Sequence, residues 1–271
     1  MIRGEKPVYG VTAMRGEVFL VRDEVAEVEV YDADTFAPLR QIPVKGLIHP
    51  VDIASSVIDN SLYIVNAVRT MFRDDNTIHR TELKGQTTKW AVKGTIGGIS
   101  VDAGGETVTV TCNDSHKLKQ FTSNGHLIRV VRLKDNVMHP WHAVPLTAGQ
   151  FLVSHGWASD KMKRVCVVDI HGGVTRFFCG TDDLRTAMYA PHHLAVDRNG
   201  VALVADGKRI LSVRYSSMEG SELLSLEDIK CSGTVLRLCL NESGERLYVT
   251  TCDRDRKTGD VLSLELTKAA A

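Results

Sequence analysis

The sequence predicts an all-β protein in which residues 1–271 fold as a single six-bladed β-propeller, and three observations lead to this prediction. Apolar residues recur with a period of two almost everywhere, which is typical of strands and not of amphipathic helices. Related segments return about every 45 residues along the chain. Each of these repeats holds about four strand-like runs. Six units of four short strands are typical of a propeller, in which each sheet buries its faces against its neighbours.

The expected first strand of each unit carries much of the self-similarity. The six segments begin at Val8, His49, Ile96, His139, Ala190 and Val235. Aligning them places six residues at equivalent positions, which are Tyr9, Val51, Gly98, Trp141, His192 and Leu236. In a propeller the first strand is the innermost one, so these segments are expected to surround the central channel.

The expected second strands follow turn-like clusters and are the most apolar runs of each unit. Because a neighbouring sheet covers each face of such a strand, we expect one residue at the middle of each run to be mostly buried. These residues are Phe19, Ile64, Val110, Val153, Leu203 and Val249.

Third strands are expected at 28–31, 77–80, 117–121, 164–168, 209–213 and 260–264, and a weaker fourth strand often follows. The blades are expected at approximately 5–46, 47–94, 95–137, 138–186, 187–232 and 233–268, with a short strand at residues 1–3 closing the last one. A single helical turn is expected around residues 221–228. The alternative architecture is another β-solenoid or a pair of β-sandwiches.

Unit five carries a recognisable motif. It combines Pro191, Asp197, an Asn-Gly turn at 199–200, a Val-Ala-Asp segment at 204–206 and Arg-Ile at 209–210. This pattern resembles the NHL repeat, and the chain is similar to the C-terminal NHL domain of TRIM-type proteins. The resemblance is specific in unit five and looser in the others. The resemblance implies a six-bladed propeller within a larger protein. It also implies a role in recognition, because NHL domains bind proteins and some bind single-stranded RNA.

Composition narrows the possible functions. The 33 basic and 33 acidic residues cancel, which disfavours a dedicated nucleic-acid binder. No apolar run approaches the roughly 18 residues of a membrane span, and the first residues do not resemble a signal peptide. The six cysteines form no CxxC pair and several lie in strand-like runs, so we expect reduced thiols and a cytoplasmic protein.

Polar residues of the first strands are expected to line the central channel. These are Tyr9, Asp52, Trp141, His142, His192, His193 and Arg237. Two histidines with a carboxylate could ligate zinc, and some propeller enzymes hold a metal in this channel. A third ligand at matched depth is not evident, however, and no catalytic motif occurs. We therefore expect channel-lining residues, with no metal, no cofactor and no enzymatic activity.

The loop face is the side of the ring that carries the loops between second and third strands. Its loops combine aromatic, basic and methionine residues that are typical of binding sites. The candidate contact residues are Trp157, His155, Lys161, Met162, Arg69, Phe72, His116 and Arg254. We expect this face to bind a protein or peptide. Single-stranded RNA is the first alternative, and a metal-dependent hydrolase or lyase that uses the channel histidines is the second.

Overall fold

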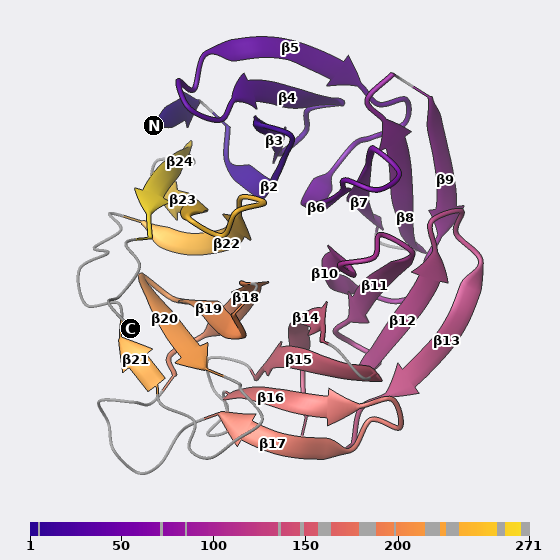
Figure 1. The fold of residues 1–271 in the computed structure, drawn as a ribbon. Coiled ribbons are helices and arrows are strands. Elements are labelled where there is room, and N and C mark those ends of the chain that lie inside the picture. The colour runs from indigo at the N-terminus through magenta and orange to yellow at the C-terminus, as the bar shows by residue number, and fades with distance from the viewer. Residues whose placement is uncertain are drawn as a thin grey trace.

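The structure is a computed structural model of the 271-residue chain. It describes all residues except 5, 71–72, 85, 135–136, 147–148, 157–163, 179–187, 198, 215–222, 226–232, 254–257 and 267–271. Side chains are also outside the description at 68–70, 73–75, 214, 223–225 and 253. The described residues form six four-stranded antiparallel sheets arranged in a ring (Figure 1). The prediction of an all-β, six-bladed propeller is confirmed.

Each blade contains four strands, which follow one another from the centre of the ring outward. Blade one contains β2 (Val8–Met14), β3 (Glu17–Arg22), β4 (Glu27–Asp32) and β5 (Pro38–Pro43). Blade two contains β6 (Pro50–Ser56), β7 (Ser61–Thr70), β8 (Arg73–Glu82) and β9 (Thr87–Ala91). Blade three contains β10 (Ile96–Val101), β11 (Thr107–Cys112), β12 (Lys117–Thr122) and β13 (Leu127–Arg132).

Blades four to six complete the ring. Blade four contains β14 (Pro140–Pro145), β15 (Gln150–His155), β16 (Arg164–Asp169) and β17 (Val174–Phe178). Blade five contains β18 (Pro191–Val196), β19 (Val201–Asp206), β20 (Arg209–Arg214) and β21 (Leu223–Ser225). Blade six contains β22 (Thr234–Leu240), β23 (Arg246–Asp253), β24 (Thr258–Glu265) and, from the start of the chain, β1 (Ile2–Gly4). The expected helical turn is wrong for residues 223–225, which form β21, and the outer parts of 221–228 lie outside the described residues.

The N-terminal strand closes the ring. β1 pairs antiparallel with β24 through Ile2 opposite Val261 and Arg3 opposite Asp260. The chain then passes into blade one so close to Gly259 that a Cβ there would lie 2.6 Å from the amide nitrogen of Val8. A residue without a side chain is therefore required where the first and last blades meet.

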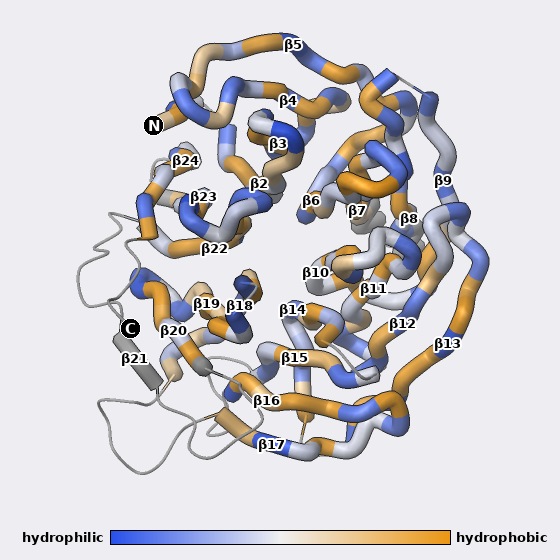
Figure 2. The backbone as a smooth tube through the Cα atoms, in the orientation of Figure 1, coloured by the Kyte–Doolittle hydropathy of each residue, from blue (hydrophilic) through white to orange (hydrophobic). Residues whose placement is uncertain are grey.

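The core lies between blades and not inside a single one. The six residues predicted at the centre of the second strands are 0–4% exposed, so this prediction is confirmed: Phe19, Ile64, Val110, Val153, Leu203 and Val249. One cluster joins Met14 and Phe19 of blade one to Ile53 and Ile64 of blade two. Figure 2 shows hydrophobic residues distributed through the strands of the whole ring. Each sheet therefore depends on its neighbours for its core.

Every first strand contains a β-bulge near its start. The register shifts once in each pairing of a first with a second strand, and the residue after the bulge occupies an equivalent place in every blade. These residues are Gly10, Asp52, Gly98, His142, His193 and Arg237. The bulge residue of blade three is therefore Gly97, so the sequence alignment that matched Gly98 to Tyr9 and Trp141 was wrong by one residue.

Two further observations concern the described residues. Cys112, Cys166 and Cys239 are free thiols. The structure contains, within its described ranges, no helix long and apolar enough to span a membrane.

Candidate functional site

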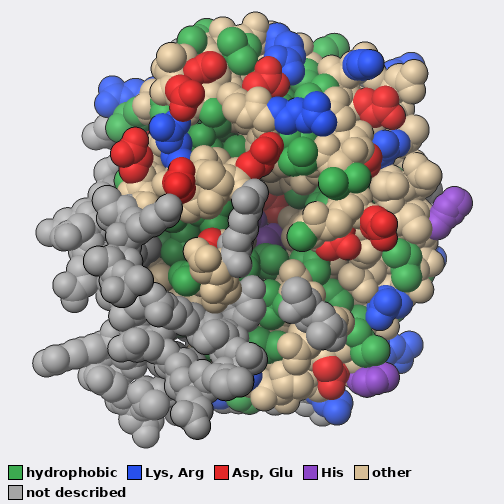
Figure 3. All heavy atoms as spheres, in the orientation of Figure 1, with side chains coloured by type: hydrophobic (Ala, Val, Ile, Leu, Met, Phe, Trp, Pro, Cys, Tyr) green, Lys and Arg blue, Asp and Glu red, His purple; other side chains and the backbone are tan. Residues whose placement is uncertain are grey.

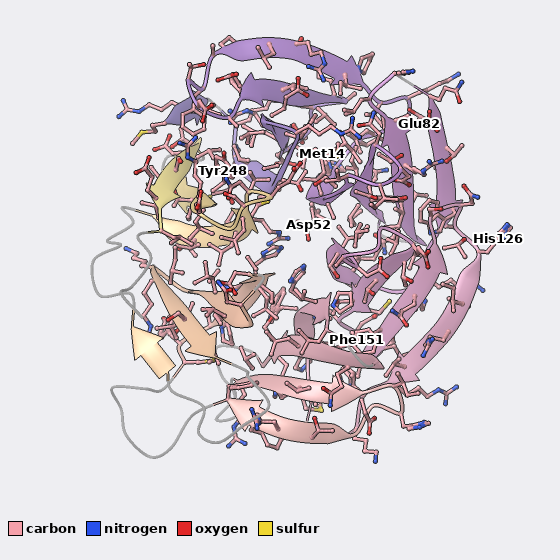
Figure 4. All side chains as sticks on the ribbon, in the orientation of Figure 1. Met14, Asp52, Glu82, His126, Phe151 and Tyr248 are labelled. Carbon is pink, nitrogen blue, oxygen red and sulfur yellow. The ribbon has the colours of Figure 1, made fainter. Side chains whose placement is uncertain are left out.

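The channel site is built from the residues that follow the bulges. Asp52, His142 and His193 are 1%, 2% and 6% exposed, so they are buried although they belong to the innermost strands. Figure 3 shows the ring hollowed at its centre, with histidine atoms deep below the rim. Asp52 lies near the middle of the ring in Figure 4. We call Asp52, His142, His193 and Arg237 the channel cluster.

An ion pair links blade two to blade six across blade one. Arg237 Nε donates to Asp52 Oδ1 at 2.9 Å, and Arg237 Nη2 donates to the carbonyl oxygen of Val51 at 2.8 Å. Blade one has Gly10 at the equivalent position, where a Cβ would lie 2.7 Å from Val21. Burial alone would raise the pKa of the Asp52 carboxyl, but Arg237 and His193 outweigh burial and hold this pKa below its usual range.

His142 is fully engaged by backbone groups of its two neighbouring blades. Its Nδ1 accepts the amide of Leu194 at 3.3 Å, and its Nε2 lies 3.1 Å from the carbonyl oxygen of Ile99. These partners fix the neutral tautomer with the proton on Nε2. Burial lowers the pKa of His142 well below its ordinary value.

His193 repeats this arrangement one blade further on. Its Nδ1 accepts the amide of Leu238 at 3.3 Å, and its Nε2 lies 3.7 Å from Asp52 Oδ2. The His142 and His193 rings are stacked with centroids 3.8 Å apart. Burial lowers the pKa of His193, although Asp52 acts in the opposite direction.

Three channel residues therefore make the same kind of bond between blades. Asp52 accepts the amide of Ile99, His142 accepts that of Leu194, and His193 accepts that of Leu238. Each amide belongs to the next blade and to the residue directly after its own channel position. These side chains thus satisfy amides that face the channel and connect consecutive blades.

Three residues of the channel cluster are of the types that ligate metal ions. The ligand atoms of Asp52, His142 and His193 all lie within 4.8 Å of one another. However, the imidazole lone pairs already accept backbone amides, and the Arg237 guanidinium already neutralises the carboxylate. A bound cation would have to break these bonds and lie beside a buried positive charge. The arrangement is better suited to holding blades together than to metal chemistry.

A second candidate site lies on the loop face between blades four and five. It is a hollow of about 760 Å³, which we call the loop-face hollow, and its lining includes Trp141, Tyr189, His192, Lys208 and Arg209. Trp141 and His192 are bulge residues that were expected in the channel; in the structure they line this hollow. Their rings meet edge to face with centroids 5.4 Å apart, and the indole Nε1 donates to the carbonyl oxygen of Gly156 at 3.1 Å.

Asp206, at the end of β19, organises one wall of the hollow. Its buried carboxylate accepts the amides of Tyr189 and Ala190 and pairs with the Arg209 guanidinium, whose Nη2 lies 2.7 Å away. Tyr189 is 67% exposed, and its ring lies over the turn at Gly207. Neither Tyr189 nor Lys208 was predicted from the sequence as a contact residue. The Val-Ala-Asp motif at 204–206 could have indicated them, because its Asp206 fixes the segment that carries Tyr189 and the turn that carries Lys208.

The remaining predicted contact residues fall in three groups. Trp157, Lys161, Met162, Phe72 and Arg254 lie outside the described residues, and Arg69 belongs to β7 with its side chain outside the description. His116 is partly buried, and its ring meets that of His139 edge to face at 5.4 Å. His155 is 1% exposed, so a partner could reach little of it. Of the expected channel residues, Tyr9 is partly buried at the bulge of β2.

Another hollow, of about 790 Å³, lies between blades one and six on the opposite side of the ring. Its charged residues largely contact one another. Arg246 pairs with Asp34 at 2.7 Å, and Glu242 accepts the amide of Arg15. These contacts join the first and last blades, so we assign this region to closure of the ring.

Comparisons with known proteins identify the fold. No protein-family model and no curated protein matches the chain. Hydrazine synthase from Kuenenia stuttgartiensis is similar in structure, with a TM-score of 0.66 and 15% identity over 94% of this chain and 79% of that one. A chain of a nidogen/laminin complex has a TM-score of 0.66 and 14% identity over 92% and 89%. Virginiamycin B lyase from Staphylococcus aureus has a TM-score of 0.64 and 11% identity over 97% and 85%. At these identities the likeness establishes that the chain has a β-propeller fold shared by enzymes and non-enzymes.

Proposed function

We propose that this protein is a non-enzymatic recognition module of the NHL type, acting in the cytoplasm as part of a larger TRIM-like protein. Its ligand is a protein or peptide segment that binds at the loop-face hollow. The observation that carries the proposal is the composition of this hollow, in which Trp141, Tyr189 and His192 lie beside Lys208 and Arg209. Aromatic and arginine side chains in a concave surface are typical anchors of protein recognition.

The channel cluster supports the non-enzymatic part of this proposal. General acid–base catalysis needs a group that can exchange a proton near the working pH. Both channel histidines have lowered pKa values and accept backbone amides, and Asp52 forms an ion pair with Arg237. Their proton-accepting positions are therefore already occupied by bonds that hold the blades together.

The NHL type is supported by the structural roles of its motif in unit five. Asp197 accepts the amides of Asn199 and Val201 and so caps the hairpin turn. Asp206 fixes the entry to its own blade and pairs with Arg209. These bonds give the two aspartates of the motif structural roles at a turn and at the end of a strand.

The experiment compares two exposed side chains on opposite faces of the ring. A partner captured with the full chain is measured against Tyr189→Ala and Ile58→Ala, since Tyr189 is 67% and Ile58 71% exposed. Ile58 lies in the turn between β6 and β7, away from the loop face. We expect Tyr189→Ala to weaken binding roughly 30-fold, as for an aromatic anchor, and Ile58→Ala to leave it within about twofold. Equal effects of both variants would contradict the loop face as the binding site.

The salt dependence of the same assay separates protein from RNA ligands. A protein anchored by aromatic residues should lose little affinity between about 50 and 200 mM salt. RNA binding should fall by orders of magnitude over this range, because phosphate contacts release counterions. A steep salt dependence with no effect of Tyr189→Ala would favour the RNA alternative.

A metal-dependent hydrolase or lyase remains the second candidate, because Asp52, His142 and His193 place their ligand atoms within 4.8 Å of one another. We expect the purified protein to contain well below one equivalent of zinc, calcium or magnesium by elemental analysis. We also expect chelator to leave its melting temperature unchanged, since a ligand that binds only the folded state stabilises it. One equivalent of metal, with a melting temperature that falls on chelation, would contradict the non-enzymatic proposal.

A further inference from the structure

The outer strand of blade three has an unusually apolar exposed edge. β13 pairs with β12 on one side, and it is the last strand of its sheet in the described part of the chain. Leu127, Ile128 and Val130 are 55%, 46% and 41% exposed. Exposed edge strands are usually protected by proline, lysine or a covering segment, because their free backbone groups can pair with another chain. The residues of β13 include neither proline nor lysine.

Three of the other outer strands, β5, β9 and β17, differ from β13 in ways that protect them. β5 begins and ends with proline, at Pro38 and Pro43. On β9 the largest side chain, that of Trp90, is partly buried against the neighbouring blade. On β17 the exposed ring of Phe177 lies under the Arg164 guanidinium, 5.1 Å from its centroid. Among these four outer strands, β13 therefore combines exposed apolar side chains with the fewest of these protections.

The charged residues of the two outer strands of blade three are all basic. β12 and β13 together contain four basic residues and no acidic residue; the basic residues are Lys117, Lys119, Arg129 and Arg132. Among the described residues, neither Arg129 nor Arg132 forms an ion pair. On β5, by contrast, Arg40 pairs with Glu17 at 2.7 Å. The charge at β13 is therefore available to an acidic partner.

Both ends of β13 are held by neighbouring blades. The turn before it lies against Trp90 of β9, so closely that a Cβ at Gly125 would lie 2.6 Å from Trp90 Cδ2. After the strand, Lys134 donates its amide to the carbonyl oxygen of Gly172 in blade four at 3.2 Å. An edge strand fixed in this way loses little conformational entropy when another strand pairs with it.

We propose that β13 is a second docking site, at which a partner protein adds a short extended strand with alternating apolar and acidic side chains. The backbone edge supplies main-chain hydrogen bonds, the exposed Leu127 and Val130 contact apolar residues on one face, and Arg129 attracts the acidic ones on the other face. A bulge at Ile128 twists the start of the edge and limits the added strand to a few residues. A second copy of this chain fits poorly, because its β13 would add two arginines to an edge that is already basic.

The test uses a defined peptide probe and the full chain. An acetylated, amidated octapeptide of alternating valine and glutamate is titrated into isotope-labelled protein, and backbone amide shifts are followed by NMR. We expect shifts concentrated in β12 and β13. Arg129→Glu should weaken binding roughly fivefold, because it places like charges opposite each other. Arg3→Glu, on the exposed outer strand β1, changes the net charge equally and should leave binding unchanged.

Three results would overturn the proposal. The first is the absence of shifts in β13 at several millimolar peptide. The second is undiminished binding of the same peptide N-methylated at alternate residues, because such a peptide cannot complete the backbone ladder. The third is a dimer in sedimentation that Arg129→Glu alters, which would mean that a second copy occupies the edge. Arg129 is exposed, so an unchanged melting temperature should confirm that its variant folds.

Discussion

Asp52, His142 and His193 show how single residues hold the blades in register. The repeat pattern was sufficient to predict that all three line the channel at comparable depth. It could not show that each accepts the amide of the following blade, because that role depends on a bulge that turns the side chain inward. The ion pair of Asp52 with Arg237 could not be predicted from the sequence either, since 185 residues separate them.

The channel histidines make stability depend on pH. His142 and His193 have folded-state pKa values below that of an unfolded histidine, about 6.5, and burial lowers the pKa of His79 to about 4. As the pH falls below about 6.5, the unfolded chain therefore binds protons that the folded protein does not. The free energy of unfolding should fall, by up to about 1.4 kcal/mol per pH unit for each such histidine. Asp52 acts in a lower window, because its lowered pKa stabilises the fold until the pH drops below about 3.9.

Urea denaturation between about pH 7 and 5 measures this dependence. His193→Asn is the informative variant, because an asparagine oxygen can still accept the Leu238 amide while the titrating group is removed. We expect its unfolding free energy to vary less steeply with pH, by about one proton. Lys208→Asn, on an exposed side chain, should keep the slope of the unaltered protein. An identical slope in His193→Asn would mean that His193 titrates normally in the folded state.

Strands differ in how far their sequences reveal their positions. The second strands were predictable because burial on both faces leaves a continuous apolar run, as in β3 and β19. The bulges of the first strands were not, since a one-residue irregularity leaves no periodic signal. In blade three, for example, the sequence did not show which of two adjacent glycines is the bulge residue. A Cβ at Gly97 would lie 2.4 Å from the carbonyl oxygen of Trp141, so the close approach of blades three and four explains a glycine that the alignment could not place.

The loop face illustrates a second limit of the sequence. Its aromatic and basic residues were chosen by residue type within long loops, and most of them lie outside the described residues. The loop-face hollow is instead formed by residues next to strand ends, such as Trp141, Tyr189 and Lys208. Their proximity follows from the packing of blade four against blade five. Contacts between units that are distant in sequence cannot be found from composition alone.

At the scale of the whole molecule, the ring depends on a three-residue strand. β1 provides the fourth strand of blade six, and Ile2 is buried in the cluster that also contains Val8, Tyr248 and Val261. The sequence predicted the first three strands of this blade and a short closing strand at residues 1–3, but so few residues gave little indication of how firmly they close the ring. In the structure, Gly259 and the Arg22 guanidinium beside Gly4 fit tightly around this junction.

Closure by β1 predicts where the ring opens first. Ile2→Asp places an unpaired carboxylate in the buried cluster, so we expect the free energy of unfolding to fall by about 3 kcal/mol. Arg3→Ala changes the neighbouring exposed residue and should cost less than about 0.5 kcal/mol. Hydrogen exchange should also become faster in β1, β24 and β2 of the Ile2→Asp variant, while β11 and β15 keep their protection, because the buried cluster around Ile2 joins only the first and last blades. Equal loss of protection in all six blades would instead show that the ring unfolds as one cooperative unit, in which β1 stabilises every blade and not only the junction it closes.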